Sequence, residues 1–180
     1  MAANNKVRIG AGEWRSRLLT FPDIAGLRPT PDRVRQTLFN WLGQDLHGLT
    51  CLDLFSGTGV MGFESLSRGA SRAVLIEKSM PAYRALIENK TALRATNAEI
   101  HNMDAMDFLK NNTDLFNVIF VDPPYNQNWL PRILPLLQEH LHQDGYLYVE
   151  AEYALEDLKE WQITKRGKAG NVFYHLLKVY

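Results

Sequence analysis

The fold of this chain is decided by the stretch Asn117-Val118-Ile119-Phe120-Val121-Asp122-Pro123-Pro124-Tyr125. Its apolar, β-branched run is the pattern of a strand buried on both faces, as in the centre of a parallel sheet. Two consecutive prolines cannot donate to a β-ladder, so we expect the strand to stop at Asp122. Open α/β sheets bind their ligands beyond the carboxyl ends of their strands. The stretch therefore predicts a ligand site that holds a carboxylate, rigid carbonyls and an aromatic ring.

The residues that follow this strand suit an exocyclic amine on a planar base. The Asp122 carboxylate and the Pro123 carbonyl can each accept one N–H bond, which favours a tetrahedral nitrogen with its lone pair directed outward. Tyr125 can stack on the ring and fix its plane, as aromatic side chains do for unpaired bases. The alternative is a proline-rich turn that only ends a strand. We favour the functional interpretation because a second motif agrees with it.

The second motif is the segment Ser56-Gly57-Thr58-Gly59-Val60-Met61-Gly62, which joins an expected strand at 49–55 to a helix that ends near Arg68. Glycines let the backbone approach a ligand closely, and a helix N-terminus offers free N–H groups. The glycine spacing is that of the dinucleotide fingerprint, which is weak evidence alone. Glu77 ends the next expected strand, twenty residues after Gly57. An acid there can hold both ribose hydroxyls of an adenosine-containing cofactor, and a purely structural glutamate is the alternative.

Strands and helices alternate from residue 49 to residue 151, which predicts an α/β, Rossmann-like fold. A closing hairpin is expected at 161–180, with its turn at Gly167-Lys168-Ala169-Gly170. The prediction is a mostly parallel seven-stranded sheet with an antiparallel hairpin at one edge. Asp104 falls at the ligand edge, where it can accept the amino group of an adenine or serve only as a helix N-cap. The remaining expected strands are 73–77, 97–101, 117–122 and 145–151, and the remaining expected helices are 79–93, 103–110 and 130–141.

The N-terminal part carries an excess of positive charge. Residues 1–35 hold seven lysines and arginines against three acidic residues, a net charge of +4, while the whole chain is neutral. We expect a short hairpin at 6–21, with Arg15 and Arg17 on one face of a strand. Thr30 is expected to cap a helix that runs to about Leu42 and carries Arg33 and Arg35 in its first turns. The asymmetry is consistent with a basic arm for a phosphate-rich partner, and a solvated charged face is the alternative.

Composition limits the remaining possibilities. A length of 180 residues suits one domain, and no apolar run is long enough to span a membrane. Residues 1–6 lack the features of a signal peptide, so the cytoplasm is expected. The single cysteine, Cys51, is expected to be a buried apolar residue. The five histidines show no metal-ligand spacing, so we predict no metal site.

Together these motifs resemble class I S-adenosylmethionine-dependent methyltransferases that act on amino nitrogens. More narrowly, the chain resembles the bacterial small-subunit rRNA (guanine-N2)-methyltransferase D family, from Val7 onward. That family usually has two adjacent glycines and an Arg-Gly-Arg in its N-terminal hairpin, where this chain has Gly10-Ala11-Gly12 and Arg15-Ser16-Arg17. The motifs that carry the resemblance are Asp53-Leu54-Phe55-Ser56-Gly57-Thr58-Gly59, Glu77, Asp104, Asp122-Pro123-Pro124-Tyr125, Arg28-Pro29-Thr30, Arg33-Val34-Arg35, Phe39-Asn40-Trp41-Leu42 and Ser67-Arg68-Gly69-Ala70.

The resemblance implies methylation of the exocyclic N2 amine of one guanine in 16S rRNA, within an assembled small-subunit particle, with S-adenosyl-L-methionine as the cofactor. It implies a catalytic core at 31–180 and an RNA-facing hairpin extension at 1–30, and a monomer is the default expectation. Asp122, Pro123 and Tyr125 would bind the target guanine, and Arg15, Arg17, Arg33 and Arg35 would contact RNA. The implied cofactor residues are Arg28, Thr30, Asp53, Phe55, Gly57, Gly59, Glu77, Asp104 and Ala105.

Three alternatives stay open on the sequence alone. Another amino-methyltransferase, acting on adenine N6 in DNA or on another RNA, shares the Asp-Pro-Pro-Tyr motif. An NAD-dependent oxidoreductase shares the glycine spacing and Glu77, but Asp-Pro-Pro-Tyr has no evident role in hydride transfer. A non-catalytic RNA-binding protein would have no reason to place the Asp122 carboxylate against phosphate-rich RNA. Equilibrium binding of S-adenosylmethionine against NAD separates the methyltransferases from the oxidoreductase.

Overall fold

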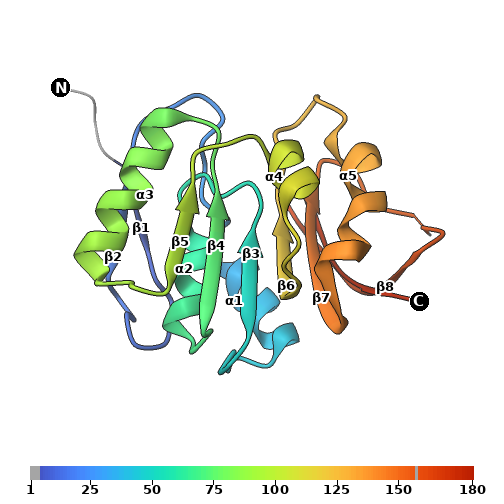
Figure 1. Ribbon diagram of the computed structural model, residues 1–180, viewed down its shortest axis with the longest axis horizontal. Coiled ribbons are helices and arrows are strands. Elements are labelled where there is room, and N and C mark those ends of the chain that lie inside the picture. The colour runs from blue at the N-terminus through green and yellow to red at the C-terminus, as the bar shows by residue number, and fades with distance from the viewer. Residues whose placement is uncertain (1–4, 157) are drawn as a thin grey trace.

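The central sheet of the computed structural model, which describes residues 5–156 and 158–180, has seven strands (Figure 1). In chain order they are β3 (Thr50–Asp53), β4 (Arg72–Ile76), β5 (Ala98–His101), β6 (Phe116–Val121), β7 (Leu141–Ala151), β8 (Trp161–Ala169) and β9 (Val172–Val179). Their order across the sheet is β5-β4-β3-β6-β7-β9-β8. The first five pair in parallel, and β9 pairs antiparallel with β7 and β8. The predicted mostly parallel sheet with an antiparallel edge hairpin is confirmed.

The strand β6 lies in the middle of this sheet and is buried on both of its faces. Val118 and Phe120 belong to one apolar cluster, and Ile119 and Val121 belong to the other. This alternation is the side-chain period of two that a pleated strand imposes. Because β3, β6 and β7 are parallel, their carboxyl ends meet at one edge of the sheet. The carboxylate after β6 is therefore placed at the same edge as the residues that end its two neighbours.

Helices cover both faces of the sheet, which gives three layers (Figure 1). The first cluster packs α1, α2 and α3 against one face, and the second packs α4 and α5 against the other. A 3-10 turn at Gln138–His140 follows α5, and β7 begins at Leu141. The helix predicted at 130–141 therefore ends earlier, at Leu137. The helices are α1 (Asp32–Leu42), α2 (Val60–Ser67), α3 (Met80–Leu93), α4 (Ala105–Asn111) and α5 (Trp129–Leu137).

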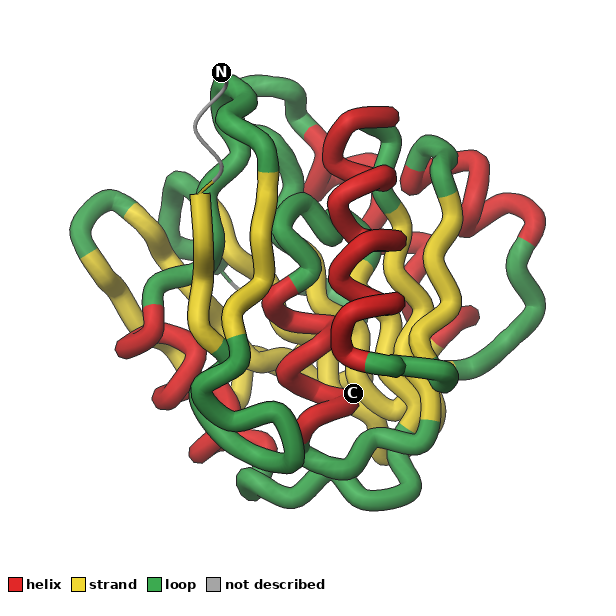
Figure 2. Tube along the Cα trace, turned by 90° about the vertical axis from the view of Figure 1, so that its left-hand side faces the viewer, coloured by secondary structure: helices red, strands yellow, loops and turns green. Residues whose placement is uncertain are grey.

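A separate two-stranded hairpin, β1 (Asn5–Arg8) and β2 (Leu18–Phe21), lies beside α3 (Figure 2). Arg15 lies in the turn between the strands and Arg17 precedes β2, so the prediction that both share one strand face is wrong. The physical reason is that this segment is held against the end of α2: the backbone N–H of Trp14 donates to Ser67 Oγ at 2.9 Å. Gly12 has φ +83, and a Cβ there would lie 1.8 Å from the Ser67 carbonyl oxygen, so only glycine fits.

The start of α1 also differs from the prediction. Its N-cap is Pro31, which makes no side-chain cap hydrogen bond, and the helix begins at Asp32. The hydroxyl of Thr30, predicted to cap this helix, instead donates to Glu150 Oε1 at 2.8 Å. Thr30 lies one residue before the cap position, and its hydroxyl donates a charge-assisted bond to a carboxylate, so it ties the segment before α1 to β7.

The structure bears on three expectations that came from the composition. Cys51 is buried in β3, as predicted. The predicted absence of a signal peptide concerned residues 1–6, of which residues 1–4 lie outside the described residues. Within the part of the chain that the structure describes, no helix is long and apolar enough to cross a membrane.

Candidate functional site

The carboxyl edge of the parallel strands gathers five acidic side chains from distant parts of the sequence. Asp53 ends β3, Glu77 follows β4, and Asp104 precedes α4. Asp122 follows β6, and Glu150 lies one residue before the end of β7. This is the edge at which open α/β sheets bind ligands. The arrangement is thus a candidate active site rich in carboxyl groups.

The glycine-rich loop after β3 is shaped by tight packing. Gly59 has φ +80, and a Cβ there would lie 2.4 Å from Leu86 Cδ2, so a larger residue is excluded. The loop is held by Glu77, whose carboxylate accepts from the N–H of Gly57 at 2.7 Å and of Ser79 at 2.9 Å. Glu77 therefore lies against the glycine loop, as the spacing in the sequence indicated.

Asp53 is buried under the same loop. Its Oδ2 accepts from the backbone N–H of Gly62 at 3.1 Å. Burial raises the pKa of Asp53 to about 7, the Gly62 N–H opposes this, and the charges of Glu77 and Glu150 raise the pKa further. No lysine or arginine forms an ion pair with it among residues 5–156 and 158–180. A buried carboxylate in this state is stabilised by a ligand that brings a positive charge.

Asp122 and Glu150 form a hydrogen-bonded pair of carboxyl groups at the end of β6. Burial raises the pKa of Asp122 well above its ordinary value, and the charge of Glu150 and the hydrogen bond to it raise it further. Burial also raises the pKa of Glu150, although hydrogen bonds from Thr30, Tyr148 and Asp122 oppose that shift. The Tyr148 hydroxyl donates to Glu150 Oε1 at 2.8 Å. Two buried carboxyl groups in contact cannot both be ionised at low cost, which is why the pKa of each is raised.

A cavity of about 270 Å³ opens beside this pair, lined by Pro123, Tyr125, Trp129, Glu150 and Tyr153 among others. Tyr125 and Tyr153 are 40% and 48% exposed, so their rings are free to stack on a planar ligand. Burial, together with the charges of Asp122, Glu150 and Glu152, raises the pKa of Tyr125 to about 12. Tyr125 is therefore a neutral phenol at physiological pH.

The sequence left open whether Asp104 accepts the amino group of an adenine or serves only as a helix N-cap. Its Oδ1 accepts from the N–H of Met106 at 2.8 Å and of Asp107 at 3.4 Å, so it is the N-cap of α4. Its Oδ2 lies 3.7 Å from Lys78 Nζ. Ala105 is buried directly behind it. The capping role does not use Oδ2, so an additional contact with a ligand stays a prediction.

The remaining predicted cofactor residues flank the same edge. Phe55 packs edge-on against Trp129, with ring centroids 5.1 Å apart. Arg28 is exposed and Thr30 is buried against Glu150. The loop before α1 thus reaches the Asp122 side of the site, while Phe55 connects the glycine-loop side to the wall of the cavity.

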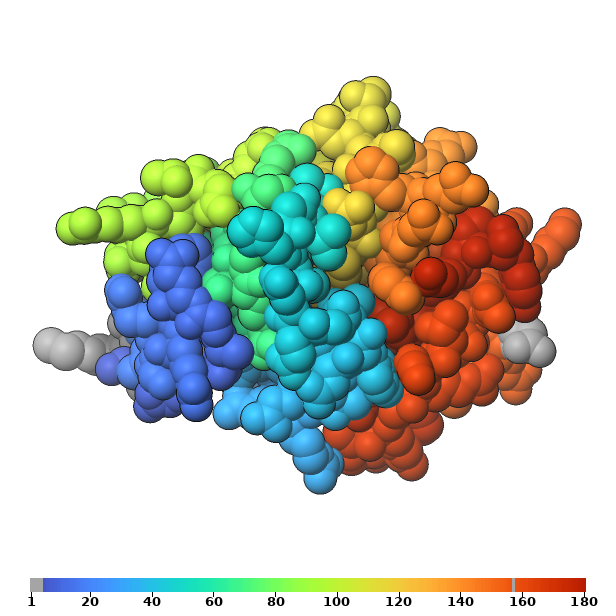
Figure 3. Space-filling view, turned by 90° about the horizontal axis from the view of Figure 1, so that it is seen from below, coloured from blue at the N-terminus to red at the C-terminus, as the bar shows by residue number. Residues whose placement is uncertain are grey.

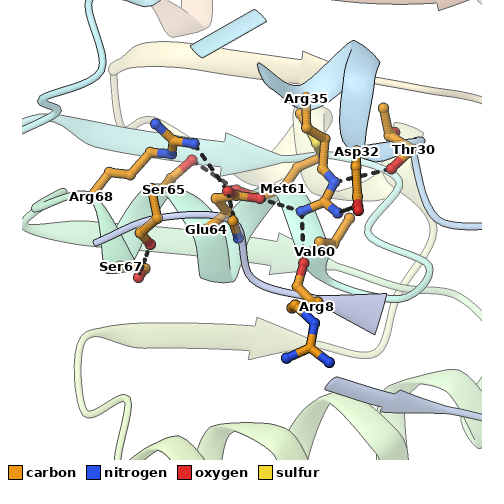
Figure 4. A network of polar contacts seen from close by, with 12 residues as sticks. Arg8, Thr30, Asp32, Arg35, Val60, Met61, Glu64, Ser65, Ser67 and Arg68 are labelled. Atoms are coloured by element: carbon orange, nitrogen blue, oxygen red, sulfur yellow. Dashed lines mark hydrogen bonds and ion pairs between the residues drawn. The ribbon is translucent and has the colours of Figure 1, made fainter. Parts of the chain in front are cut away.

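Arg35 corrects the prediction of four RNA-contacting arginines. It is 2% exposed and pairs with Glu64 and Asp32 (Figure 4). It also donates to the carbonyls of Thr30 and Arg8, each at 3.0 Å. A guanidinium with these internal partners cannot reach a phosphate. The helical period explains the error, since Arg35 lies on the face of α1 that faces Glu64 of α2.

The other three predicted arginines, Arg15, Arg17 and Arg33, are exposed. Arg17 donates to the Ala92 carbonyl at 3.0 Å, which leaves part of its guanidinium available. Figure 3 shows the hairpin, α1 and the C-terminal strands as neighbouring parts of one surface. The C-terminal strands carry three exposed cations, Lys165, Arg166 and Lys168.

The sequence analysis missed Glu150 as a site residue. A signal for it was present, because Glu150 interrupts the apolar end of an expected strand in the same way as Asp53 and Glu77. Tyr153 was also missed, and it carries no motif that could have identified it. No group of three or more His, Cys, Asp or Glu side chains in residues 5–156 and 158–180 has the geometry of a metal site.

Comparison with known proteins adds independent findings. The family model described as Conserved hypothetical protein 95 matches residues 7–178. Ribosomal RNA small subunit methyltransferase D of Escherichia coli (strain K12) is 41% identical over 180 residues, which cover 97% of this chain and 91% of the relative. The solved structure of a candidate methyltransferase, yhhF, from Escherichia coli has a TM-score of 0.87 at 40% identity and covers 97% of this chain and 98% of that chain.

A more distant solved structure shares the fold. It is an RNA methyltransferase from Salinibacter ruber in complex with S-adenosyl-L-homocysteine, with a TM-score of 0.65 at 18% identity. The match covers 83% of this chain and 92% of that chain. At this identity the likeness concerns the architecture alone, and the residues of the present site stand on their own geometry.

Proposed function

The chain belongs to the ribosomal RNA small subunit methyltransferase D family, and on that premise we propose that it methylates the exocyclic N2 amine of one guanine in small-subunit rRNA. The chain is an S-adenosylmethionine-dependent rRNA methyltransferase. One observation carries the finer proposal: the end of β6 places Asp122, Pro123 and Tyr125 beside a cavity of about 270 Å³ at the ligand edge of the sheet. That set suits an amine on a planar base.

The residues at the glycine-loop side fit the cofactor. Asp53 is a buried carboxylate without a cationic partner in the described residues, which suits the ammonium group of the methionine end. The two carboxylate oxygens of Glu77 each accept one backbone N–H, from Gly57 and from Ser79, and each keeps a lone pair for a ribose hydroxyl. The same edge of the sheet is bordered by Phe55, Gly59, Asp104 and Ala105. Arg28 and Thr30 lie next to it, in the segment before α1. When bound, S-adenosylmethionine supplies an electrophilic methyl carbon, and its sulfur keeps the electron pair of the broken C–S bond.

The residues of the chain act on the amine chiefly by alignment. An exocyclic amine is a poor nucleophile because its lone pair is delocalised into the base. Hydrogen bonds to the Asp122 carboxyl oxygen and the Pro123 carbonyl favour a tetrahedral nitrogen, and the Tyr125 ring fixes the plane of the base. Alignment of this kind can contribute roughly 7–11 kcal/mol. Asp122 lies closest to the proton that the methylated nitrogen releases.

The proposal extends to the form of the substrate. We propose that the enzyme acts in the cytoplasm as a monomer on RNA inside an assembled small-subunit particle. The test is methylation of naked 16S rRNA, isolated small subunits and duplex DNA, followed by mass mapping of the modified base. Methyl incorporation at guanine N2 in the particle supports the proposal. Incorporation at adenine N6 in DNA instead would overturn it.

Replacing Glu77 with glutamine should weaken S-adenosylmethionine binding by about ten- to hundredfold, because a neutral amide loses one charge-assisted hydrogen bond to the ribose, worth roughly 1.5–3 kcal/mol. The Gly57 contact can be retained by the amide oxygen. Isothermal titration calorimetry with S-adenosylmethionine and with NAD measures the effect. Glu99→Gln, a change in a half-buried residue of β5, is the control and should leave the affinity unchanged. Tighter binding of NAD than of S-adenosylmethionine would contradict the assignment of the site.

Replacing Arg15, Arg17 and Arg33 together with alanine should weaken RNA binding and flatten its salt dependence. Each lost phosphate contact lowers the log–log salt slope by about 0.7 on single strands, compared with roughly 0.9 on B-form DNA. RNA affinity at four salt concentrations measures the slope. The matched control removes three exposed cations elsewhere, Arg84, Lys110 and Lys159. Equal slopes in the two triple variants would place the RNA on another surface, with Lys165, Arg166 and Lys168 the next set to change.

A further inference from the structure

Glu150 occupies an unusual position for a carboxylate. Glu150 is 4% exposed and lies near the end of β7, next to β6, the strand that Asp122 follows. Its Oε1 accepts from Thr30 Oγ1 and from the Tyr148 hydroxyl, each at 2.8 Å. The carboxyl group of Asp122 is its third partner. Glu150 is therefore held by Thr30 and Tyr148 against the carboxyl group of Asp122, the residue that the proposed function places at the substrate amine.

The groups around this pair are acidic or phenolic. Asp53 faces it from β3, Tyr125 faces it from the rim of the cavity with Glu152 beside the tyrosine, and Tyr148 lies on β7 itself. Tyr174 of β9 faces Tyr148. Among the described residues, no lysine or arginine affects the pKa of either carboxyl group. Two neighbouring carboxylates without a cation cannot both stay ionised at low cost, so they share a proton.

We propose that Glu150 is the positioning residue of the methyl-transfer step: it orients Asp122 through their shared hydrogen bond and takes up the proton that the methylated amine passes to Asp122. This inference rests on the proposed function, because it needs an amine at Asp122. Glu150 acts through Asp122 and not on the base.

The proton that the methylated amine loses passes along the pair of carboxyl groups. The nitrogen lone pair forms the new N–C bond, and the nitrogen becomes cationic. The N–H proton then moves to the outward oxygen of Asp122, and its electron pair stays on nitrogen. The proton that Asp122 already holds moves to Glu150, which becomes a neutral carboxylic acid. After the product leaves, the pair returns one proton to water through the open cavity, and Asp122 again donates to Glu150.

Replacing Glu150 with glutamine isolates this role. The amide oxygen can still accept from Thr30 and Tyr148, and the amide N–H₂ can donate to Asp122, so shape and hydrogen bonds are kept. The change removes a negative charge beside Asp122 and adds a donor to its ionised form, so the pKa of Asp122 should fall toward the ordinary range. Carbon-13 NMR of labelled aspartate carboxyl groups, titrated with pH in the intact protein, measures this. The resonance of Asp122 is identified by its absence in Asp122→Asn.

A matched control and a rate measurement complete the experiment. Glu152→Gln removes the same charge two residues along the chain and should leave the Asp122 titration near its parent value. Single-turnover methyl transfer by Glu150→Gln should fall about a hundredfold, the lower end of the contribution of a group that moves a proton, with S-adenosylmethionine affinity unchanged. In Asp122→Asn the further change Glu150→Gln should cost little more, because Glu150 acts through Asp122.

The outcomes separate the inference from the proposed function. An unchanged Asp122 titration in Glu150→Gln, or an additive loss in the double variant, overturns the role of Glu150 while the parent still methylates RNA. If the parent transfers no methyl group to rRNA, the proposed function fails instead. A fall in melting temperature without a shift of the Asp122 titration would make Glu150 a purely structural residue.

Discussion

Replacing Asp122 with alanine should remove most methyl transfer while leaving the affinity for S-adenosylmethionine within several-fold of the parent. Asp122 lies at the end of β6, on the cavity side of the site, whereas Asp53 and Glu77 occupy the glycine-loop side. The loss of one hydrogen bond between the amine and the Asp122 carboxyl group, which shares a proton with Glu150, is worth roughly 0.5–1.5 kcal/mol. Misalignment of the amine adds to it, since orientation can contribute roughly 7–11 kcal/mol. We therefore expect a fall of at least a hundredfold in rate.

Single-turnover kinetics with rRNA and calorimetry with the cofactor measure the two quantities. Asp122→Asn is the informative comparison, because its amide can donate to Glu150 and its oxygen can accept one N–H of the amine. It should retain more activity than Asp122→Ala. Near-normal turnover by Asp122→Ala would remove Asp122 from the mechanism. A large loss of cofactor affinity would instead move Asp122 to the cofactor side of the site.

Replacing Glu64 with glutamine should lower the free energy of unfolding by about 3–5 kcal/mol, the usual cost of breaking a buried ion pair. The side chain of Glu64 is 1% exposed and lies between Arg35 and Arg68, whose side chains are also buried (Figure 4). Glu64 Oε1 also accepts from the backbone N–H of Gly10 at 3.0 Å. The amide would leave Arg68 buried without its counter-charge, and Arg35 with the exposed Asp32 carboxylate alone.

Urea denaturation followed by circular dichroism measures this prediction. The matched control is Asp114→Asn, which breaks an exposed pair with Arg72 at 2.9 Å. Exposed pairs contribute about 0–1 kcal/mol, so the control should unfold close to the parent. If the two variants lose equal stability, the network in Figure 4 is not what joins the hairpin and α1 to α2. Increased proteolysis of the hairpin in Glu64→Gln is the expected companion result.

The sequence by itself determined the sheet and the place of the site. The β-branched run to Val121 and the two prolines after it act on the local backbone, so the central strand and its end could be predicted without the rest of the chain. Gly57 and Gly59 likewise fix a turn that few other residues can adopt. The edge hairpin and the alternation of strands and helices followed from the same local patterns.

Only the tertiary structure decided which polar residues are partners. Thr30 and Glu150 are 120 positions apart in the chain, and Arg35 and Glu64 are 29 apart. Arg33 and Arg35 look alike in the sequence, yet one is exposed and the other is buried in an ion pair. Local propensity carries no information about these choices. A buried charge needs a partner in a medium of low dielectric constant, and that partner exists only after the strands and helices have packed.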